Sequence, residues 1–336
     1  MAVDAVPGLR FVEGLRRAWN AGDAVFPVDP RLPPPARAAL VAAMRPGDAV
    51  QPGDALVVAT SGSTGAPKGV VLTHDALALS TAAVSKRLGV DPATDLWLAG
   101  LPLGHIGGLG VVVRAMLSAT PLTFDPAAGA TLTSMVATQL ERQDPGRFRV
   151  VLVGGSADWR RRPANVVHTY GLTETGGGIV YDGIALDGVE VRADSEDQLW
   201  VRGPTTLRCY RDGIDPKDAD GWLPTGDVGA VVDGVVSVFG RADDRIVTGG
   251  EKVWPGQVEP ILAAHPAVAE AMVVGRLDDE WGQRVVALIV PVDAVRPPAL
   301  DELRELVRAV LPAWCAPKQL EVVGALPRTA SGKRRR

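Results

Sequence analysis

Short apolar runs alternate with helical stretches over the first half of this 336-residue chain, and this alternation limits the folds open to it. Strands that alternate with helices form β-α-β units, so we expect a mainly parallel sheet with ligands at the strands' carboxyl ends. The runs predicted as strands are 55–59, 69–73, 96–99, 121–124 and 150–153. The stretches predicted as helices are 9–19, 35–44, 74–88, 109–117 and 131–141.

The pattern changes from about residue 189 to residue 239, where alternating runs are separated by Asp-Gly pairs typical of antiparallel hairpins. Beyond Gly240 the chain is predicted to form a small α+β unit. Its expected elements are a helix after Trp254-Pro255, strands at 271–274 and 285–291, and a helix at 300–311. We therefore predict an α/β protein with a large domain over 1–240, including the hairpin region, and a small mobile domain over 241–336.

Composition excludes several classes of protein. A net charge of −4 gives no electrostatic case for nucleic acid as the main partner. Two cysteines, Cys209 and Cys315, cannot build a disulfide scaffold or a four-thiolate zinc site, so a reducing, cytoplasmic setting is expected. No apolar run reaches the ~18–20 residues that span a bilayer, and no signal peptide is read, so no membrane insertion is expected.

The loop between the first two predicted strands, TSGSTGAPKGV, has the composition of a phosphate-binding loop. Its glycines let backbone N–H groups approach a phosphate, its hydroxyls add donors, and its lysine supplies charge. The Walker spacing is absent, and a flexible surface turn is the alternative interpretation. The candidate phosphate-binding residues are Thr60, Ser61, Gly62, Ser63, Thr64, Gly65 and Lys68.

This loop resembles the signature loop of the adenylate-forming superfamily, which includes acyl- and aryl-CoA ligases, luciferases and peptide-synthetase adenylation domains. Five further motifs follow in the order of that family. They are HTYGLTE at 168–174, LPTGD at 223–227, GRADDRI at 240–246, GGEKVWP at 249–255 and LPRTASGK at 326–333. Together the six motifs identify the chain as similar to this superfamily over most of its length.

The resemblance implies that the chain activates a carboxylic acid with ATP, and that a thiol, here coenzyme A, then displaces AMP from the acyl adenylate. The acid is itself the nucleophile, so no serine elbow is needed, and G-x-S-x-G is absent. The implied cofactors are ATP, Mg²⁺ and coenzyme A. Glu174 carries the hard oxygen that suits Mg²⁺, with an exposed loop glutamate as the alternative.

The family motifs also imply roles for other residues. Lys333 would neutralise charge between the attacking carboxylate and the α-phosphate, with a disordered basic tail as the alternative, and Thr173 would donate to that phosphate. His105, in LPLGHI, would shape the acid and pantetheine channel, with a core histidine as the alternative. Asp243 is the predicted hinge. The remaining candidate nucleotide-binding residues are Gly154, Gly155, Ser156, Tyr170, Gly171, Asp227, Arg241, Gly249 and Gly250.

Three of these candidates have specific roles and alternatives. Tyr170 would stack on adenine, or pack in the core. Asp227 would accept hydrogen bonds from both ribose hydroxyls, or cap a turn. Arg241 would reach the ribose or a phosphate, or form a surface ion pair.

Only 59 residues precede Thr60, fewer than the family usually has, and such short chains resemble actinobacterial o-succinylbenzoate–CoA ligases of menaquinone biosynthesis. The run Gly176–Gly178 would leave room for a flat aromatic ring. The second carboxylate of such an acid needs a donor or cation, for which Thr175, Tyr181 and His105 are candidates. The alternatives are a CoA ligase for another aryl or acyl acid, a carrier-protein-loading adenylating enzyme and a non-catalytic nucleotide-binding protein; a homodimer also stays open.

Overall fold

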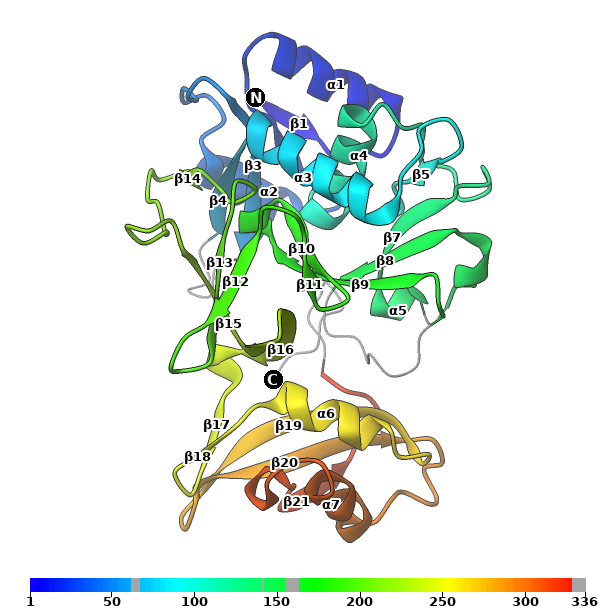
Figure 1. Cartoon of the computed structure of the whole chain (residues 1–336), viewed down its shortest axis with the longest axis vertical. Helices are drawn as coiled ribbons and strands as arrows, with labels where there is room; N and C mark the ends of the chain where they lie inside the picture. Colours follow the sequence, from blue (N-terminus) through cyan, green and yellow to red (C-terminus); the bar gives the residue numbers. More distant parts are fainter. Residues whose placement is uncertain (62–66, 141, 155–162, 328–336) are drawn as a thin grey trace. The chain divides into compact units, whose positions relative to one another are not determined.

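The computed structural model describes residues 1–61, 67–140, 142–154 and 163–327 (Figure 1). The chain divides into two compact units. The first comprises Met1–Arg192, Trp200–Thr225 and Val232–Val236, and the second comprises Ala193–Leu199, Gly226–Val231 and Ser237–Arg336. Two segments that precede residue 240 thus belong to the second unit, and the domain boundary expected at residue 240 stays a prediction.

A parallel sheet forms the centre of the first unit, as the alternation of strands and helices predicted. Its strands lie in the order β6-β5-β7-β8-β9, and each neighbouring pair is parallel. Buried residues such as Trp97, Leu132 and Val151 line these strands, as is usual for sheets covered on both faces. The strands are β5 (Trp97–Leu98), β6 (Leu122–Thr123), β7 (Leu132–Val136), β8 (Val150–Gly154) and β9 (Val166–Leu172).

The helices of the first unit agree with the prediction except in one segment. The helix expected at 131–141 is wrong, because the apolar part of that segment forms β7 and only Ala137–Leu140 is helical. A short apolar run cannot be assigned to strand or helix by periodicity alone. The helices are α1 (Leu9–Asn20), α2 (Pro34–Met44), α3 (His74–Leu88), α4 (Ile106–Leu117) and α5 (Ala137–Leu140).

The glycine-rich loop joins two strands of a separate antiparallel sheet, not two strands of the parallel one. Strands β3 (Asp54–Ser61), β4 (Pro67–Thr73) and β14 (Cys209–Tyr210) lie in the order β14-β4-β3. The pairing continues to the loop itself, with Thr60 opposite Lys68 and Ser61 opposite Pro67. Strand β4 thus runs antiparallel to β3 along its whole length. Strands β1 (Ala2–Asp4) and β2 (Phe26–Val28) form a further parallel pair.

Antiparallel strands continue the large sheet beyond β9, in the order β10, β11, β16, β15, β13 and β12. The Asp-Gly pair at 233–234 forms the expected tight turn between β15 and β16, with positive φ at both residues (50° and 78°). The strands are β10 (Gly177–Tyr181), β11 (Ile184–Ala185), β12 (Glu190–Ala193), β13 (Gln198–Arg202), β15 (Leu223–Val232) and β16 (Val235–Arg241).

The second unit contains the expected α+β arrangement. Its strands lie in the order β18-β17-β20-β19, with β21 parallel to β20, and the helices α6 and α7 bury Val258, Leu262, Leu303 and Val307 in its core. The elements are β17 (Ile246–Thr248), β18 (Glu251–Val253), α6 (Pro255–Ala263), β19 (Val268–Asp278), β20 (Gly282–Pro291), α7 (Leu300–Arg308) and β21 (Gln319–Val322).

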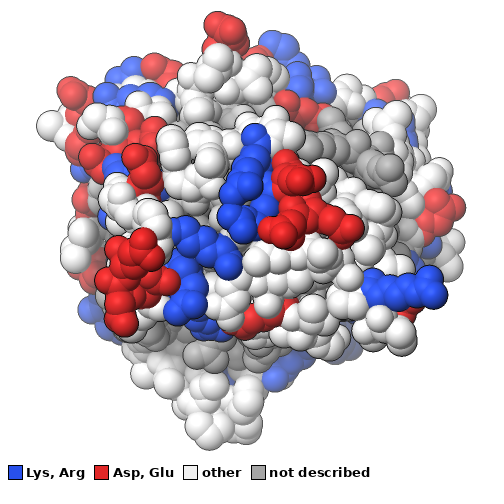
Figure 2. All heavy atoms as spheres, turned by 90° about the horizontal axis from the view of Figure 1, so that it is seen from below, with Lys and Arg blue, Asp and Glu red and all other residues white. Residues whose placement is uncertain are grey.

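Acidic and basic side chains are mixed on the face shown in Figure 2, where neither sign covers a continuous area. This agrees with the small net charge. Among the described residues, no helix combines the length and the apolar character that crossing a membrane requires.

Candidate active site

Two of the predicted site residues, Thr173 and Glu174, lie at the carboxyl end of β9 in a 3₁₀ turn over Thr173–Thr175. Thr175 locks this turn. Its buried Oγ1 accepts from the Leu172 N–H at 2.9 Å and lies 2.7 Å from the Gly177 carbonyl oxygen. The Thr175 hydroxyl thus makes its hydrogen bonds to the backbone, whereas the Glu174 side chain is only half-buried.

The backbone of β10 passes close to β9 just before this turn. A Cβ atom placed on Gly171 would lie 2.0 Å from the carbonyl oxygen of Gly177, so only glycine fits there. Gly171 is therefore required by the close approach of two strands. Tyr170, one residue earlier, is half-buried and lies opposite Val180 of β10.

Glu174 is connected to the phosphate-loop strand through Tyr210, a residue that the sequence analysis did not single out. The Tyr210 hydroxyl donates to Glu174 Oε1 at 3.1 Å. The Lys68 Nζ atom lies 4.9 Å from the centroid of the Tyr210 ring. Burial, followed by the neighbouring Glu174 charge, raises the pKa of Tyr210, so its hydroxyl keeps its proton near neutral pH.

Only some of the remaining candidates in the phosphate and adenine loops are among the described residues. Thr60 and the backbone of Ser61 end β3, and Gly154 ends β8 at an exposed position. Residues Gly62, Ser63, Thr64, Gly65, Gly155, Ser156 and Lys333 lie outside the described residues, and their predicted roles stay predictions.

His105 occupies the N-cap position of α4, where its side chain makes no capping hydrogen bond, and it is exposed, so it is not the core histidine considered as its alternative. The first turns of α4 face the glycine run of β10. A Cβ atom on Gly177 would lie 4.0 Å from Ile106 Cγ1, and one on Gly110 would lie 4.0 Å from the Gly176 carbonyl oxygen. His105 and the glycine run are therefore connected through one helix.

The same helix carries Arg114, a buried cation that the sequence analysis missed. Its residue surface is 8% exposed, and its Nε atom has no hydrogen-bond partner. A Cβ atom on Gly110 would lie 3.3 Å from Nη1, and the Trp97 ring centroid lies 5.2 Å from Cζ. Within the described residues no carboxylate forms an ion pair with it.

Burial lowers the pKa of Arg114, but a guanidinium does not lose its proton in a protein, so the charge remains. An unpaired buried charge is costly and calls for a counter-charge. Such a position suits an anionic ligand.

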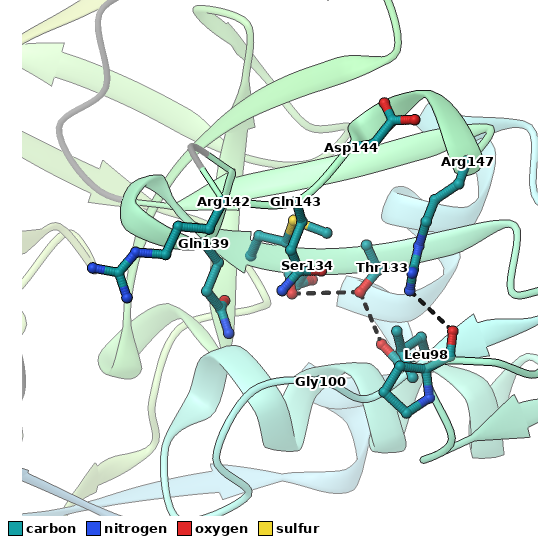
Figure 3. A pocket seen from close by; sticks show the side chains of 11 residues that line it. Leu98, Gly100, Thr133, Ser134, Gln139, Arg142, Gln143, Asp144 and Arg147 are labelled. Carbon is teal, nitrogen blue, oxygen red and sulfur yellow. Dashed lines mark hydrogen bonds between the residues drawn. The ribbon is translucent and has the colours of Figure 1, made fainter.

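A pocket of about 460 Å³ opens at the carboxyl ends of β5 and β7 (Figure 3). Thr133 Oγ1 donates to the Leu98 carbonyl at 3.1 Å, and Arg147 Nη2 donates to the Pro126 carbonyl at 3.0 Å. The lining includes Ser134, Gln139 and Arg142, but none of the predicted site residues.

In the second unit, the predicted ribose residue Asp227 pairs with Arg241, another predicted site residue. Arg241 Nη1 donates to Asp227 Oδ1 at 3.2 Å, and Asp227 is 7% exposed. A Cβ atom on Gly226 would lie 2.8 Å from Arg241 Nη2, so glycine at 226 makes room for the guanidinium. The buried Asp227 carboxylate and the Arg241 guanidinium thus form an ion pair.

Gly249 and Gly250 form the two-residue turn between β17 and β18, with φ values of 60° and 84°. The Gly249 N–H donates to the Trp281 carbonyl at 2.9 Å. Asp243, the predicted hinge, is exposed in a 3₁₀ turn over Ala242–Asp244. The structure therefore gives both segments a defined conformation, and their roles stay predictions.

Glu174, in the turn that follows β9, carries the carboxylate that a magnesium ion would use. The described residues contain no cluster of three or more His, Cys, Asp or Glu side chains that could hold a metal alone. Mg²⁺ in nucleotide-dependent enzymes is commonly held by one or two carboxylates together with substrate phosphates. The half-buried Glu174 fits that mode of binding.

Comparison with known proteins identifies the family of the chain. A model of the AMP-binding enzyme family matches residues 35–211, and a model of the AMP-binding enzyme C-terminal domain matches residues 257–333. The chain therefore belongs to the AMP-binding enzyme family, which is the adenylate-forming class that its motifs resemble.

Curated relatives narrow the similarity. A probable 2-succinylbenzoate–CoA ligase of Mycobacterium tuberculosis (strain ATCC 25618 / H37Rv) is 40% identical over 331 residues, covering 88% of the chain and 86% of the relative. The 2-succinylbenzoate–CoA ligase of Bacillus cereus (strain ATCC 10987) is 32% identical over 329 residues, covering 82% and 68%.

Solved structures show the same relationship. Escherichia coli MenE, bound to an analogue of OSB-AMS, has a TM-score of 0.81 and 26% identity, covering 98% of this chain and 86% of that one. Bacillus subtilis o-succinylbenzoate CoA synthetase, bound to the acyl-adenylate OSB-AMP, has a TM-score of 0.72 and 27% identity, covering 96% and 79%. The α/β fold and the family predicted from the motifs are confirmed.

Proposed function

We propose that the chain is an AMP-forming acid–CoA ligase that converts o-succinylbenzoate to o-succinylbenzoyl-CoA in menaquinone biosynthesis. The observation that carries this proposal is the 40% identity to a probable 2-succinylbenzoate–CoA ligase over 88% of the chain. The polar groups around Glu174 support it, because they suit the charge of a nucleoside triphosphate.

In the proposed reaction the protein supplies position and charge, since the substrate carboxylate attacks the α-phosphate itself. Thr173 and Lys68 would donate to phosphate oxygens. Glu174 would hold Mg²⁺, which neutralises phosphate charge when bound. Lys333 would stabilise the negative charge that develops at the α-phosphate, as the terminal motif implies.

We further propose that Arg114 pairs with the second carboxylate of the acid. One carboxylate of o-succinylbenzoate reacts and the other stays charged. Arg114 is a buried cation without an ion-pair partner in the described part of the chain, and it lies beside Gly110, which faces Gly176. A buried, paired guanidinium binds a carboxylate strongly and in a fixed orientation.

The function is tested by AMP release that depends on both ATP and coenzyme A, measured across a panel of carboxylic acids. We expect o-succinylbenzoate to give the highest kcat/KM. Low activity with this acid beside high activity with another aryl or acyl acid would reject the substrate, and AMP release that needs a carrier protein in place of coenzyme A would reject the thiol.

Asp227→Asn is expected to raise the KM for ATP about tenfold or more. The proposed ribose contacts are charge-assisted hydrogen bonds, each worth ~1.5–3 kcal/mol. The substitution would also remove the negative charge that pairs with Arg241. Steady-state ATP–pyrophosphate exchange measures the effect. Wild-type ATP kinetics in this variant would show that Asp227 does not bind the ribose.

We propose that Asp243 is the hinge about which the small domain rotates between the two half-reactions. Proline at 243 fixes φ at about −65°, a value that a 3₁₀ turn accommodates. A hinge whose backbone dihedral angles must change cannot work with φ fixed. Asp243→Pro should therefore slow thioester formation far more than adenylation, as separate single-turnover assays of the two steps would show. An equal loss in both steps would reject the hinge.

A further inference from the structure

Tyr210 lies between the two charged groups proposed to face the ATP phosphates. Its hydroxyl donates to Glu174 Oε1 at 3.1 Å, and its ring lies 4.9 Å from Lys68 Nζ. Lys68 and Glu174 themselves form no ion pair, and both are described residues. The tyrosine thus contacts an anion through its polar end and a cation through its ring.

One side of Tyr210 is fixed to the phosphate-loop strand. It lies opposite Val70 in the pairing of β14 with β4, and the next residue, Arg211, donates its backbone N–H to the Gly69 carbonyl at 2.7 Å. The Arg211 side chain donates to four carbonyl oxygens at the end of α2 and just after it, those of Met44, Arg45, Asp48 and Ala49. This clamp gives the Tyr210 backbone a defined position.

The other side of the same segment is fixed to the turn that carries Glu174. The Leu207 N–H donates to the Glu174 carbonyl at 2.6 Å. The Leu207 carbonyl accepts from Lys217 Nζ at 2.7 Å. Residues 207–211 therefore connect the phosphate-loop strand to the Glu174 turn, two parts of the chain that are far apart in sequence.

We propose that Tyr210 is a positioning residue for adenylation: it holds Glu174 through its hydroxyl and Lys68 over its ring, so that both face the nucleotide. Without it, Lys68 and Glu174 could pair with each other, and each would lose the charge that it offers to phosphate or Mg²⁺. A carboxylate fixed by a hydrogen bond also spends less conformational entropy on binding. This inference rests on the proposed function, because it assumes that Glu174 and Lys68 meet ATP.

The test is equilibrium binding of ATP with Mg²⁺ in the absence of acid, so that no turnover contributes. The variants are Tyr210→Phe, which removes the hydroxyl and keeps the ring, Glu174→Ala, and the double variant. Tyr210→Phe should weaken ATP binding about tenfold, the loss typical of one hydrogen bond to a charged group. In the Glu174→Ala background the same substitution should change the affinity less than twofold.

Cys209→Ala is the matched control. Cys209 is buried in the same strand, beside Tyr210, but its neighbours are the apolar side chains between α2 and the sheet. Cys209→Ala should lower the unfolding temperature and leave the ATP affinity unchanged. Tyr210→Phe should leave the unfolding temperature unchanged and lower the ATP affinity.

Three results would overturn the inference. Wild-type affinity in Tyr210→Phe would show that the hydroxyl positions nothing. An equal loss with and without Glu174 would show that Tyr210 does not act through that carboxylate. Wild-type affinity in Glu174→Ala would contradict the proposed placement of the phosphates, and the role of Tyr210 with it. If Glu174→Ala weakens ATP binding and Tyr210→Phe does not, only the positioning role of Tyr210 is rejected and the proposed function stands.

Discussion

Arg114→Met is expected to raise the KM for o-succinylbenzoate about a hundredfold without lowering the stability of the protein. Methionine has a similar volume and no charge, and replacing buried ionic groups by apolar side chains of similar volume is often neutral or stabilising. The substrate, in contrast, would lose the cation that pairs with its second carboxylate, and leaving a buried charge unpaired costs about 3–5 kcal/mol. Kinetics and thermal unfolding measured on the same preparation separate the two effects.

The matched control is a second acid, 4-oxo-4-phenylbutanoate, which is o-succinylbenzoate without its ring carboxylate. It has one carboxylate to activate and none to pair with Arg114. Wild-type enzyme should strongly prefer the diacid, and Arg114→Met should abolish most of that preference. An unchanged preference would show that another group binds the second carboxylate, and a marked loss of stability would show that Arg114 supports the fold.

Lys333→Ala is expected to slow adenylation by ~10²–10³-fold, the usual loss for one preorganised charge contact in a transition state. Lys333 lies outside the described residues, so this prediction rests on the terminal PRTASGK sequence and the family match that extends to residue 333. Thioester formation from a supplied acyl adenylate should persist, because that step does not involve the α-phosphate as an electrophile.

Two single-turnover measurements decide this role. One follows pyrophosphate release from acid and ATP, and the other follows thioester formation from the adenylate and coenzyme A. Normal adenylation, or an equal loss in both steps by a folded variant, would contradict the assignment. Lys333→Arg adds a control, since it keeps the charge but changes its shape and reach.

Local patterns predicted most elements of the fold correctly. The helix expected at 74–88 was placed without error, because Thr73 caps its first turn and Gly89 ends it in the left-handed conformation. The helix expected at 131–141 failed because a run of four buried residues suits a strand as well as a helix turn. The antiparallel pairing of β3 with β4 in a separate sheet was not predicted, because the composition of the glycine-rich loop does not specify how its flanking strands pair.

The predicted site residues are those that motifs contain, and the residues that join them through tertiary contacts were not predicted. Glu174 and Asp227 are found in motifs. Tyr210 meets Glu174 from 36 residues away in sequence, so no local pattern predicts their hydrogen bond. Arg114 had one available signal, a single arginine within the apolar run at 109–117, which is unusual unless the charge has a partner.

The central claim is most directly tested by analysing the products of one reaction that contains the protein, o-succinylbenzoate, ATP, Mg²⁺ and coenzyme A. Mass spectrometry and nucleotide chromatography would identify the thioester and the adenine nucleotide. The proposed function predicts o-succinylbenzoyl-CoA and AMP in equal amounts, with neither formed when ATP is omitted. Formation of ADP in place of AMP, or no thioester from this acid while another acid in the panel is converted, would contradict it.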